Sequence, residues 1–522
     1  MQRRFGIHGL KRIFACSPFA SCPKFLGGHL CSNTLHSRLR GHDVRLSGIK
    51  SQYPAFTIAA FILCLFAFSG CMSMAPGYTR PEAPVPAVWP DGPAYKDGAG
   101  KPGDLSAADI AWRDFFIDER LQKVIGLALM DNRDLRVAML NIEKAQALYR
   151  IQRAELLPTV NAGATFSTER VPGILSGSGQ RETEELYNVN LAISSWELDL
   201  FGRIRHLKDA ALLDYFATEQ ARLAAQISMM AEVANAYLTL AADRELLRLA
   251  KATLRAQEET YQLIRRRYEV GASSELDLRQ AQTRVDAARV DIARFTTIVA
   301  TDENALRLLV GSPVPDGLLP EDLHAVTLQD ISPGLPADVL QRRPDILQAE
   351  NLLMASHANI GAARAAFFPR ITLTTSIGTT SDQLSGLFTS GSDTWSFVPR
   401  IVMPIFDART WSAYDVAEVE REISLTQYER TIQVAFREVA DALAQRGTLG
   451  DQMAAQQSLV EATAESYRLS ELRYKSGVDS YLSVLDAQRS LYAAQQGLIA
   501  VRLSSLTNLV TLYKVLGGGV SE

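Results

Sequence analysis

Cysteine is scarce in this chain of 522 residues and is confined to one end. Five cysteines occur, Cys16, Cys22, Cys31, Cys64 and Cys71, and none follows Cys71. A segment of that length without disulfides must be held together by packing, hydrogen bonds or assembly. A basic excess is also lacking: the net charge is -4 and the pI is near 6.1, which argues against a nucleic-acid partner.

Motifs for catalysis or metal binding are lacking too. The histidines after Cys71 are His206, His324 and His357, which are too scattered in sequence to suggest a metal cluster. The chain contains no Gly-x-Ser-x-Gly nucleophile elbow and no Walker motif. We therefore predict that the chain is not an enzyme and holds no metal or cofactor.

An apolar run at 54–68 follows basic residues and precedes Ser69-Gly70-Cys71. It is shorter than the roughly 20 residues that a membrane-spanning helix needs. A basic region, an apolar region and small residues before a cysteine are typical of a signal peptide that ends at a lipidation site. We predict a signal region at 1–70, with an N-terminal extension of no assigned role, and lipidation of Cys71. The alternative is a buried cysteine that follows an apolar helix.

The strongest internal signal is a tandem repeat. The stretch that begins Arg267-Tyr-Glu-Val-Gly recurs 206 residues later as Arg473-Tyr-Lys-Ser-Gly. A second pair of matching stretches, at Asp134-Leu135 and Asp345-Ile346, lies 211 residues apart. We predict a Pro-rich linker at 71–105, a first repeat at 106–311, a linker at 312–337, a second repeat at 338–516 and a tail at 517–522.

Each repeat is expected to contain a helix, two strands, a very long helix and a shorter helix. Proline and glycine are absent from 204–270, and apolar residues such as Ala234, Leu238 and Ala241 recur there at helical spacing. A helix of that length would span about 100 Å. The predicted long helices are 204–270 and 408–476, and the shorter helices that follow them are 274–310 and 479–515.

Charged residues interrupt both long stretches and exclude a membrane-spanning helix. Apolar periodicity over such a length instead indicates a coiled coil or a helical barrel, and the frequent alanines favour close packing of helices. Gly271 and Gly477 fall where each long helix must end, the position at which a glycine supplies a left-handed cap.

The segments between these helices alternate apolar and polar residues. Strands are predicted at about 158–168, 186–197, 370–379 and 395–405. Their lengths approach the 9 to 11 residues of a tilted transmembrane strand. Two hairpins on a soluble core would give the same pattern. If the strands span a membrane, several chains must share one barrel, because the smallest membrane barrels have eight strands and lipid does not tolerate an open edge.

Several long motifs resemble the outer-membrane efflux proteins of the TolC and OprM type. They are Gly77-Tyr-Thr-Arg-Pro-Glu82, Trp196-Glu-Leu-Asp-Leu-Phe-Gly-Arg203, Leu335-Pro-Ala-Asp-Val-Leu-Gln-Arg-Arg-Pro-Asp345 and the paired Arg-Tyr-x-x-Gly tips. The resemblance covers nearly the whole chain after Cys71. It implies a mainly α-helical chain that contributes four strands to a membrane β-barrel, and a homotrimer with a twelve-stranded barrel and a twelve-helix tunnel.

The resemblance further implies a passive outlet channel of a tripartite efflux system of the resistance-nodulation-division (RND) class, which exports drugs or other small molecules. Its expected partners are a periplasmic adaptor, an inner-membrane RND pump and outer-membrane lipid. Met72, after the cysteine, implies sorting to the bacterial outer membrane. An outlet for type I protein secretion or metal efflux remains an alternative. A periplasmic adaptor lipoprotein is another alternative, although adaptors carry one helical hairpin between split β-domain halves.

By the same resemblance, the second tip carries a periplasmic gate. The predicted gate residues are Leu482, Asp486 and Arg489, whose spacing places them on one helical face. Around a threefold axis they would form apolar, acidic and basic rings, which are able to gate a polar conduit. An ordinary surface pair of Asp486 and Arg489 is the alternative. The first-half counterparts, Leu276, Gln280 and Thr283, lack these charges, so the constriction is expected mainly from the second tip.

Docking of the adaptor is predicted at the ends of the helical hairpins. The predicted docking residues are Arg267, Val270, Gly271, Arg473, Ser476 and Gly477. The alternative is that the glycines end the helices without any partner.

Overall fold

The computed structural model describes residues 73–96, 107–331 and 342–519. The predictions for residues 1–72, among them the signal region and the lipidation of Cys71, fall outside the described residues. The described part is mainly helical and carries one sheet of four strands. The predicted fold class is therefore confirmed.

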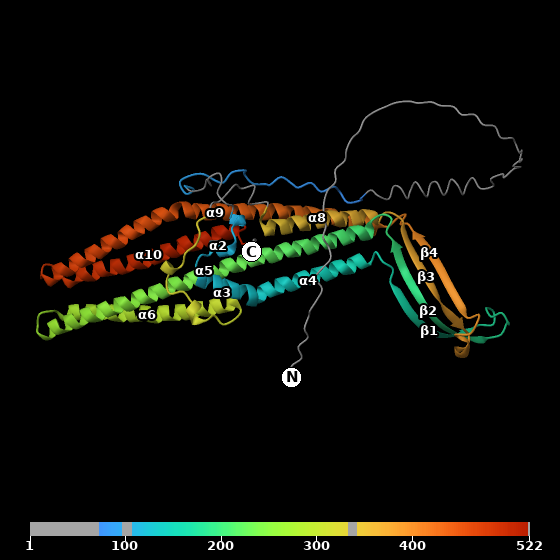
Figure 1. Cartoon of the computed structure of the whole chain (residues 1–522), viewed down its shortest axis with the longest axis horizontal. Helices are drawn as coiled ribbons and strands as arrows, with labels where there is room; N and C mark the ends of the chain where they lie inside the picture. The colour runs from blue at the N-terminus through green and yellow to red at the C-terminus, as the bar shows by residue number, and fades with distance from the viewer. Residues whose placement is uncertain (1–72, 97–106, 332–341, 520–522) are drawn as a thin grey trace, which may run out of the picture. The chain divides into compact units, whose positions relative to one another are not determined.

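The order of helices and strands repeats in the two halves (Figure 1). The first half contains α2 (Trp112–Phe115), α3 (Glu119–Asp131), α4 (Arg133–Ala154), β1 (Val160–Val171), β2 (Glu182–Leu198), α5 (Arg203–Glu269) and α6 (Glu275–Val310). The second half contains α8 (Pro344–Ala365), β3 (Arg370–Ser381), β4 (Asp393–Val402), α9 (Ala408–Lys475) and α10 (Tyr481–Val515). Short 3-10 turns are η2 (Ala107–Asp109), η3 (Asp316–Leu318), η4 (Leu323–Ala325) and η5 (Leu384–Gly386). Helices α4 and α8 both have 22 residues, as two copies of one unit would.

The expectation of a single helix before the first two strands is wrong, because this region forms α3 and α4. Asn132 separates them: its backbone is extended, and its side-chain oxygen accepts a hydrogen bond from the Leu135 N–H at 2.8 Å, which caps α4. The Asn132 side-chain amide also donates to the Leu309 carbonyl oxygen at 2.6 Å. The break is thus tied to the end of α6, far away in sequence.

The two long helices, α5 with 67 residues and α9 with 68, would each span about 100 Å at 1.5 Å per residue. Each folds back on the shorter helix that follows it, so α5 pairs with α6 and α9 with α10 (Figure 1). Unlike α5, α9 contains two glycines, Gly447 and Gly450, and is nevertheless continuous. Propensity alone therefore does not decide its continuity, and packing must contribute.

The largest core cluster joins the start of the first half to the end of the second. The Phe115 ring stacks on the Tyr513 ring, with centroids 3.9 Å apart and planes 3° apart. The Tyr513 hydroxyl donates to the Ile110 carbonyl oxygen at 2.7 Å. Tyr237 of α5 and Leu306 of α6 are fully buried in the same cluster. This core therefore holds both helical hairpins together near α2 and α3.

The four strands form one antiparallel sheet in the order β1-β2-β3-β4. Strands β2 and β3 pair across the two halves, so the sheet is continuous. Within the described residues, β1 and β4 each have a strand on one side only. The sheet lies at one end of the helices and the hairpin tips lie at the other (Figure 1). Edge strand β4 carries Pro399, as expected for a residue that cannot donate to a central ladder.

The pairing register aligns the apolar residues of all four strands on one face of the sheet. In the central rows Leu191 pairs with Ile377, and Ile377 with Trp395. The opposite face carries mainly amide and hydroxyl side chains, and there Asn190 pairs with Gly378 and Thr394 follows in the same row. We call these the apolar face and the polar face. One continuous apolar face and one polar face are typical of a membrane strand set.

A bulge in β2 preserves this division of faces. The register shifts between Ile193 and Trp196, and Ser195 has a φ of 53°. Ser194 and Ser195 thus lie opposite the single residue Thr374, which is the pattern of a β-bulge. As a result Trp196 lies on the apolar face and Glu197 on the polar face.

Candidate functional site

Both hairpin tips turn through the same backbone motif. Gly271 and Gly477 have φ values of 76° and 72°, in the left-handed region that favours glycine. In the first tip the Gly271 N–H donates to the Tyr268 carbonyl oxygen at 2.9 Å, and the Ala272 N–H donates to that of Arg267 at 2.7 Å. The second tip has the same two hydrogen bonds in the same places. This Schellman motif confirms the predicted role of the glycines as helix caps.

The two tips pack against each other through an apolar cluster. Ile264 and Ala281 of the first hairpin are buried with Tyr481, Val484 and Leu485 of the second. Beside this cluster the Arg267 guanidinium lies 5.2 Å from the centre of the Tyr474 ring. The cluster and this cation–π contact couple the two tips within one chain.

The three predicted gate residues lie on the other side of α10. Leu482 is 61% exposed, and the side chains of Asp486 and Arg489 are 64% and 66% exposed. Asp486 and Arg489 form an ion pair at 2.5 Å. The structure thus brings the three together on a face that the rest of the chain leaves uncovered, while the opposite face is buried in the apolar cluster.

The predicted docking residues gather at the two turns, but some have local partners that the sequence did not reveal. Val270 is 78% exposed. Arg473 instead forms a two-pronged ion pair with Asp479, at 2.6 and 3.0 Å, across the turn. The Ser476 hydroxyl donates to the Leu472 carbonyl oxygen at 2.9 Å. Arg267 is partly buried, whereas the other five residues of the set are exposed.

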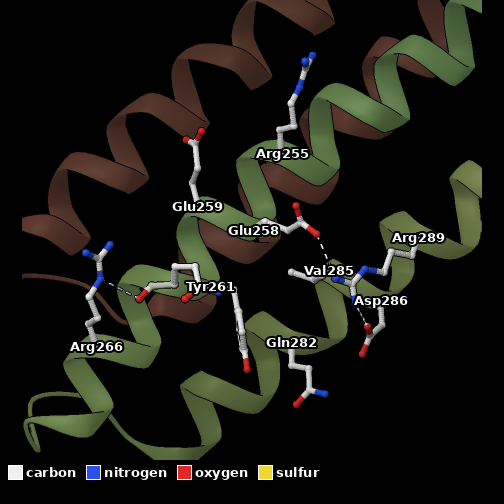
Figure 2. Close-up of a pocket in the computed structure, with 10 residues that line it drawn as sticks. Arg255, Glu258, Glu259, Tyr261, Arg266, Gln282, Val285, Asp286 and Arg289 are labelled. Atoms are coloured by element: carbon white, nitrogen blue, oxygen red, sulfur yellow. Dashed lines mark hydrogen bonds and ion pairs between the residues drawn. The ribbon is translucent and has the colours of Figure 1, made fainter.

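A polar groove of about 600 Å³ runs along the first hairpin, close to its tip (Figure 2). It is lined by Arg255, Glu258, Glu259, Tyr261, Gln262, Arg266, Gln282, Val285, Asp286 and Arg289. An ion pair between Arg289 of α6 and Glu258 of α5, at 3.1 Å, crosses it. Sequence reasoning missed this groove, because it depends on which faces of α5 and α6 meet.

An N-terminal strap, residues 73–96, packs along α8 and α9, although the sequence suggested only a linker there. Glu350 of α8, with a side chain 8% exposed, anchors it. This carboxylate accepts hydrogen bonds from the Tyr78 hydroxyl at 2.9 Å and from Arg80 Nε at 2.7 Å. Burial raises the pKa of Glu350, but these hydrogen bonds outweigh burial and hold the pKa below its ordinary value.

The strap runs from the sheet end of the helices toward their middle. At its start the Met74 N–H donates to Nε2 of His206, near the beginning of α5, at 3.3 Å. Farther along, the Trp89 ring stacks on Phe436 with centroids 5.0 Å apart. Near its end the backbone of Ala94 lies so close to Gly447 of α9 that a side chain there would not fit. The absence of a side chain at Gly447 therefore leaves room for the strap to pack against α9.

Two carboxyl groups meet between α5 and α6, away from the tips. Burial, together with a hydrogen bond to Asp302, raises the pKa of Asp243 to about 7. Near neutral pH Asp243 therefore carries a proton part of the time. Among the residues that the structure describes, no group of three or more His, Cys, Asp or Glu side chains is arranged to hold a metal ion.

Comparisons with known proteins agree with this arrangement. The model of the outer membrane efflux protein family matches residues 124–312 and 335–518. The chain is similar to the probable efflux pump outer membrane protein TtgC of Pseudomonas putida, with 49% identity over 470 residues that cover 90% of this chain and 96% of TtgC.

Solved structures show the same similarity. A crystal structure of a membrane protein from Pseudomonas aeruginosa matches with a TM-score of 0.80 and 42% identity, over 86% of this chain and 98% of that one. The open state of the MtrE outer membrane channel of Neisseria gonorrhoeae matches with a TM-score of 0.78 and 39% identity, over 86% and 99%. The chain therefore belongs to the outer membrane efflux protein family, whose members are transport conduits of the outer membrane rather than enzymes.

Proposed function

We propose that three copies of this chain form the outer-membrane channel of a tripartite RND-type efflux system, a passive conduit for drugs or other small molecules. The observation that supports this most is the sheet. It has four strands, one continuous apolar face and a free edge on each side within the described residues. In lipid such edges must be paired, and four strands are too few to close a barrel. Copies of the same chain supply the missing strands when β4 of one pairs with β1 of the next.

The position of the strap supports a lipid anchor at Cys71. The described part of the strap begins at Ser73, two residues after that cysteine. Arg364, at the end of α8 next to β3, donates to the Met74 carbonyl oxygen at 3.3 Å. The start of the strap is thus held at the sheet end of the helices. Acyl chains on Cys71 would then lie beside the strands that cross the membrane, where an anchor is able to insert.

The tips support the proposals of a gate and of a docking site. The uncovered face of α10 presents Leu482, Asp486 and Arg489, so a threefold axis beside it would bring together three copies of each. For the adaptor, the exposed Val270 and the charged groove beside the first tip offer a surface of mixed charge. A helical partner with complementary charges would fit such a surface.

The test is the oligomeric state of the protein extracted from membranes in mild detergent. We expect native mass spectrometry to find trimers in the outer-membrane fraction. A monomer in that extract, or protein found in the aqueous fraction, would contradict the channel. The lipid anchor is tested separately by labelling with palmitate: Cys71→Ala should lose the label, whereas Cys64→Ala should keep it.

A further inference from the structure

The charged residues on the polar face of the sheet are not evenly distributed. At the loop end the polar face carries Glu169, Glu182 and Glu184. Its middle is neutral and consists of amide, hydroxyl and small side chains, such as Asn188, which donates to the Thr380 hydroxyl at 2.7 Å. At the helix end it carries Glu197, Arg370 and Arg400. The polar face is therefore negatively charged at the loop end and has a net positive charge at the helix end.

The single carboxylate at the helix end is already fully engaged. Glu197, whose side chain is 9% exposed, accepts hydrogen bonds from Nε and Nη2 of Arg203 at 3.0 and 2.9 Å. Arg370 Nε approaches the same carboxylate at 2.5 Å. This carboxylate thus faces two guanidinium groups, and Glu155 at the end of α4 also attracts that of Arg203. The neighbouring ion pairs, Arg205 with Asp199 and Arg409 with Asp407, are internally balanced and add no net charge.

Arg400 adds a further positive charge at this end. It pairs with Thr372 of β3, which pairs in turn with Glu197 of β2, so the three residues lie in one row across the polar face. Arg400 is exposed and forms no hydrogen bond or ion pair with the described part of the chain. Glu197 lies two strands away and is occupied by Arg203 and Arg370. This end of the polar face therefore carries two guanidinium groups and one carboxylate per chain, a net positive charge.

The arrangement depends on the bulge in β2. Without the shift between Ile193 and Trp196, strict alternation would place Glu197 on the apolar face and Trp196 on the polar face. Because of the bulge, Glu197 lies beside Arg370. Its carboxylate then holds the guanidinium groups of Arg203 and Arg370 in place. Next to them, between the ends of the strands and the starts of α5 and α9, lies a cavity of about 600 Å³. Arg370 lines this cavity together with Asp199 and Asp407, whereas Arg400 does not.

We propose that Arg370 and Arg400 form a cationic ring where the barrel meets the helices, and that this ring favours the passage of anions and of solutes with a carboxylate or phosphate group. The proposal rests on the proposed function, because the polar face lines a lumen only if the trimer forms. Three chains bring six guanidinium groups and three carboxylates to one level of that lumen. Rings of arginine or lysine select anions in other pores, and a narrow passage with low-dielectric walls strengthens their field.

The experiment measures ion selectivity of purified trimers in planar bilayers under a gradient of KCl. Both the reference protein and its variants carry Asp486→Ala and Arg489→Ala, so that the proposed gate does not limit the current. The chloride-to-potassium permeability ratio of the reference is compared with that of each variant, because the loop-end carboxylates are the same in all of them. Arg400→Gln should reduce the chloride-to-potassium permeability ratio several-fold, Arg400→Glu should reduce it further, and Arg400→Lys should retain it.

The matched control is Arg170→Gln, because Arg170 lies near the loop end on the apolar face and its charge should not reach the lumen. Unchanged selectivity in both Arg400→Gln and Arg400→Glu would overturn the ring. An equal change in Arg170→Gln would overturn it too, since the effect would then be one of net charge. A trimer that conducts without such changes leaves the proposed function intact, whereas the absence of any trimer or conductance contradicts both proposals.

Discussion

In both hairpin tips a glycine with positive φ ends the long helix, but different side chains close the turn that follows. The first tip has a capping box: the Ser274 hydroxyl accepts from the Asp277 N–H at 3.1 Å, and the Asp277 carboxylate accepts from the Ser274 N–H at 3.2 Å. In the second tip Ser480 makes no such side-chain hydrogen bond to α10, and the ion pair of Arg473 with Asp479 spans the turn. The first tip is thus fixed by neutral-donor caps and the second by charge.

The two tips also differ in charge along the helices that follow them, α6 and α10. The second tip presents Asp486 and Arg489 on an uncovered face, whereas the positions that match them in the first tip are Gln280 and Thr283. The second tip is held by a pair of opposite charges, which salt screens, whereas in the first tip the Asp277 carboxylate accepts only from neutral donors. We therefore expect gating mainly from the second hairpin.

The largest expected effect comes from removing the charges of the proposed gate. Asp486→Ala together with Arg489→Ala should raise the single-channel conductance in planar bilayers several-fold, because the charged rings that narrow the entrance would be gone. The matched control is Gln280→Ala with Thr283→Ala, at the equivalent positions of the first tip, which should leave the conductance unchanged. An unchanged conductance in the first double variant would reject the gate. Equal increases in both would remove the distinction between the tips.

The next effect concerns docking at the turns. No atom lies near the space where a side chain at Gly477 would begin, so a large residue fits sterically but must adopt a positive φ. That conformation costs a non-glycine residue about 1 to 2 kcal/mol, and Asn tolerates it better than most. Gly477→Phe should therefore abolish efflux in cells while trimers persist, and Gly477→Asn should retain efflux.

The same pair of substitutions at Gly271 tells whether both tips dock. Loss of efflux in Gly271→Phe, measured as drug susceptibility of the complemented strain, would mean that the adaptor contacts both hairpins. Normal efflux in Gly477→Phe, with the protein present at wild-type amounts, would contradict docking at the second tip.

Much of the fold was predictable because its signals are local. The absence of proline and glycine over 204–270 predicted α5 to within one residue at each end, and alternation predicted four strands in the right order. Strand ends were less accurate: β2 begins at Glu182 and not near 186, and β4 begins at Asp393 and ends at Val402. Strand ends depend on pairing with a neighbour, which the sequence of one strand does not contain.

The features that escaped sequence analysis all depend on residues far apart in the chain. The break at Asn132 uses the Leu309 carbonyl, and the strap is anchored by Glu350, which lies 270 residues after Arg80. For the site, helical spacing predicted that the three gate residues share a face, but their position relative to a lumen depends on neighbouring chains. The gate and the docking residues therefore stay predictions.

A smaller effect is expected from the cap of the first tip. Ser274→Ala should lower the local stability of the start of α6 by about 1 kcal/mol, because the loss of an N-cap side chain leaves backbone N–H groups unpaired. Hydrogen exchange of the amides at 275–278 measures it. Ser480→Ala, at the matching position of the second tip, should have little effect, since Ser480 makes no cap among the described residues. Equal losses at both tips would show that the structural difference has no energetic consequence.

The smallest effect is the response of the second tip to acid. The hydrogen bonds from Arg473, and then its charge, hold the pKa of Asp479 below its ordinary value. A carboxylate with a depressed pKa stabilises the fold above its unfolded-state pKa of about 4, and the contribution is lost as the pH falls through the folded-state value. Hydrogen exchange at 478–482, corrected for its intrinsic pH dependence, should therefore lose protection in acid, and added salt should weaken that protection at neutral pH. Arg473→Gln removes the pair and should make this protection insensitive to acid. The first tip has Ser273 at the position of Asp479 and therefore lacks this ion pair. The same acid dependence in Arg473→Gln as in the wild type would show that the ion pair does not hold the second turn.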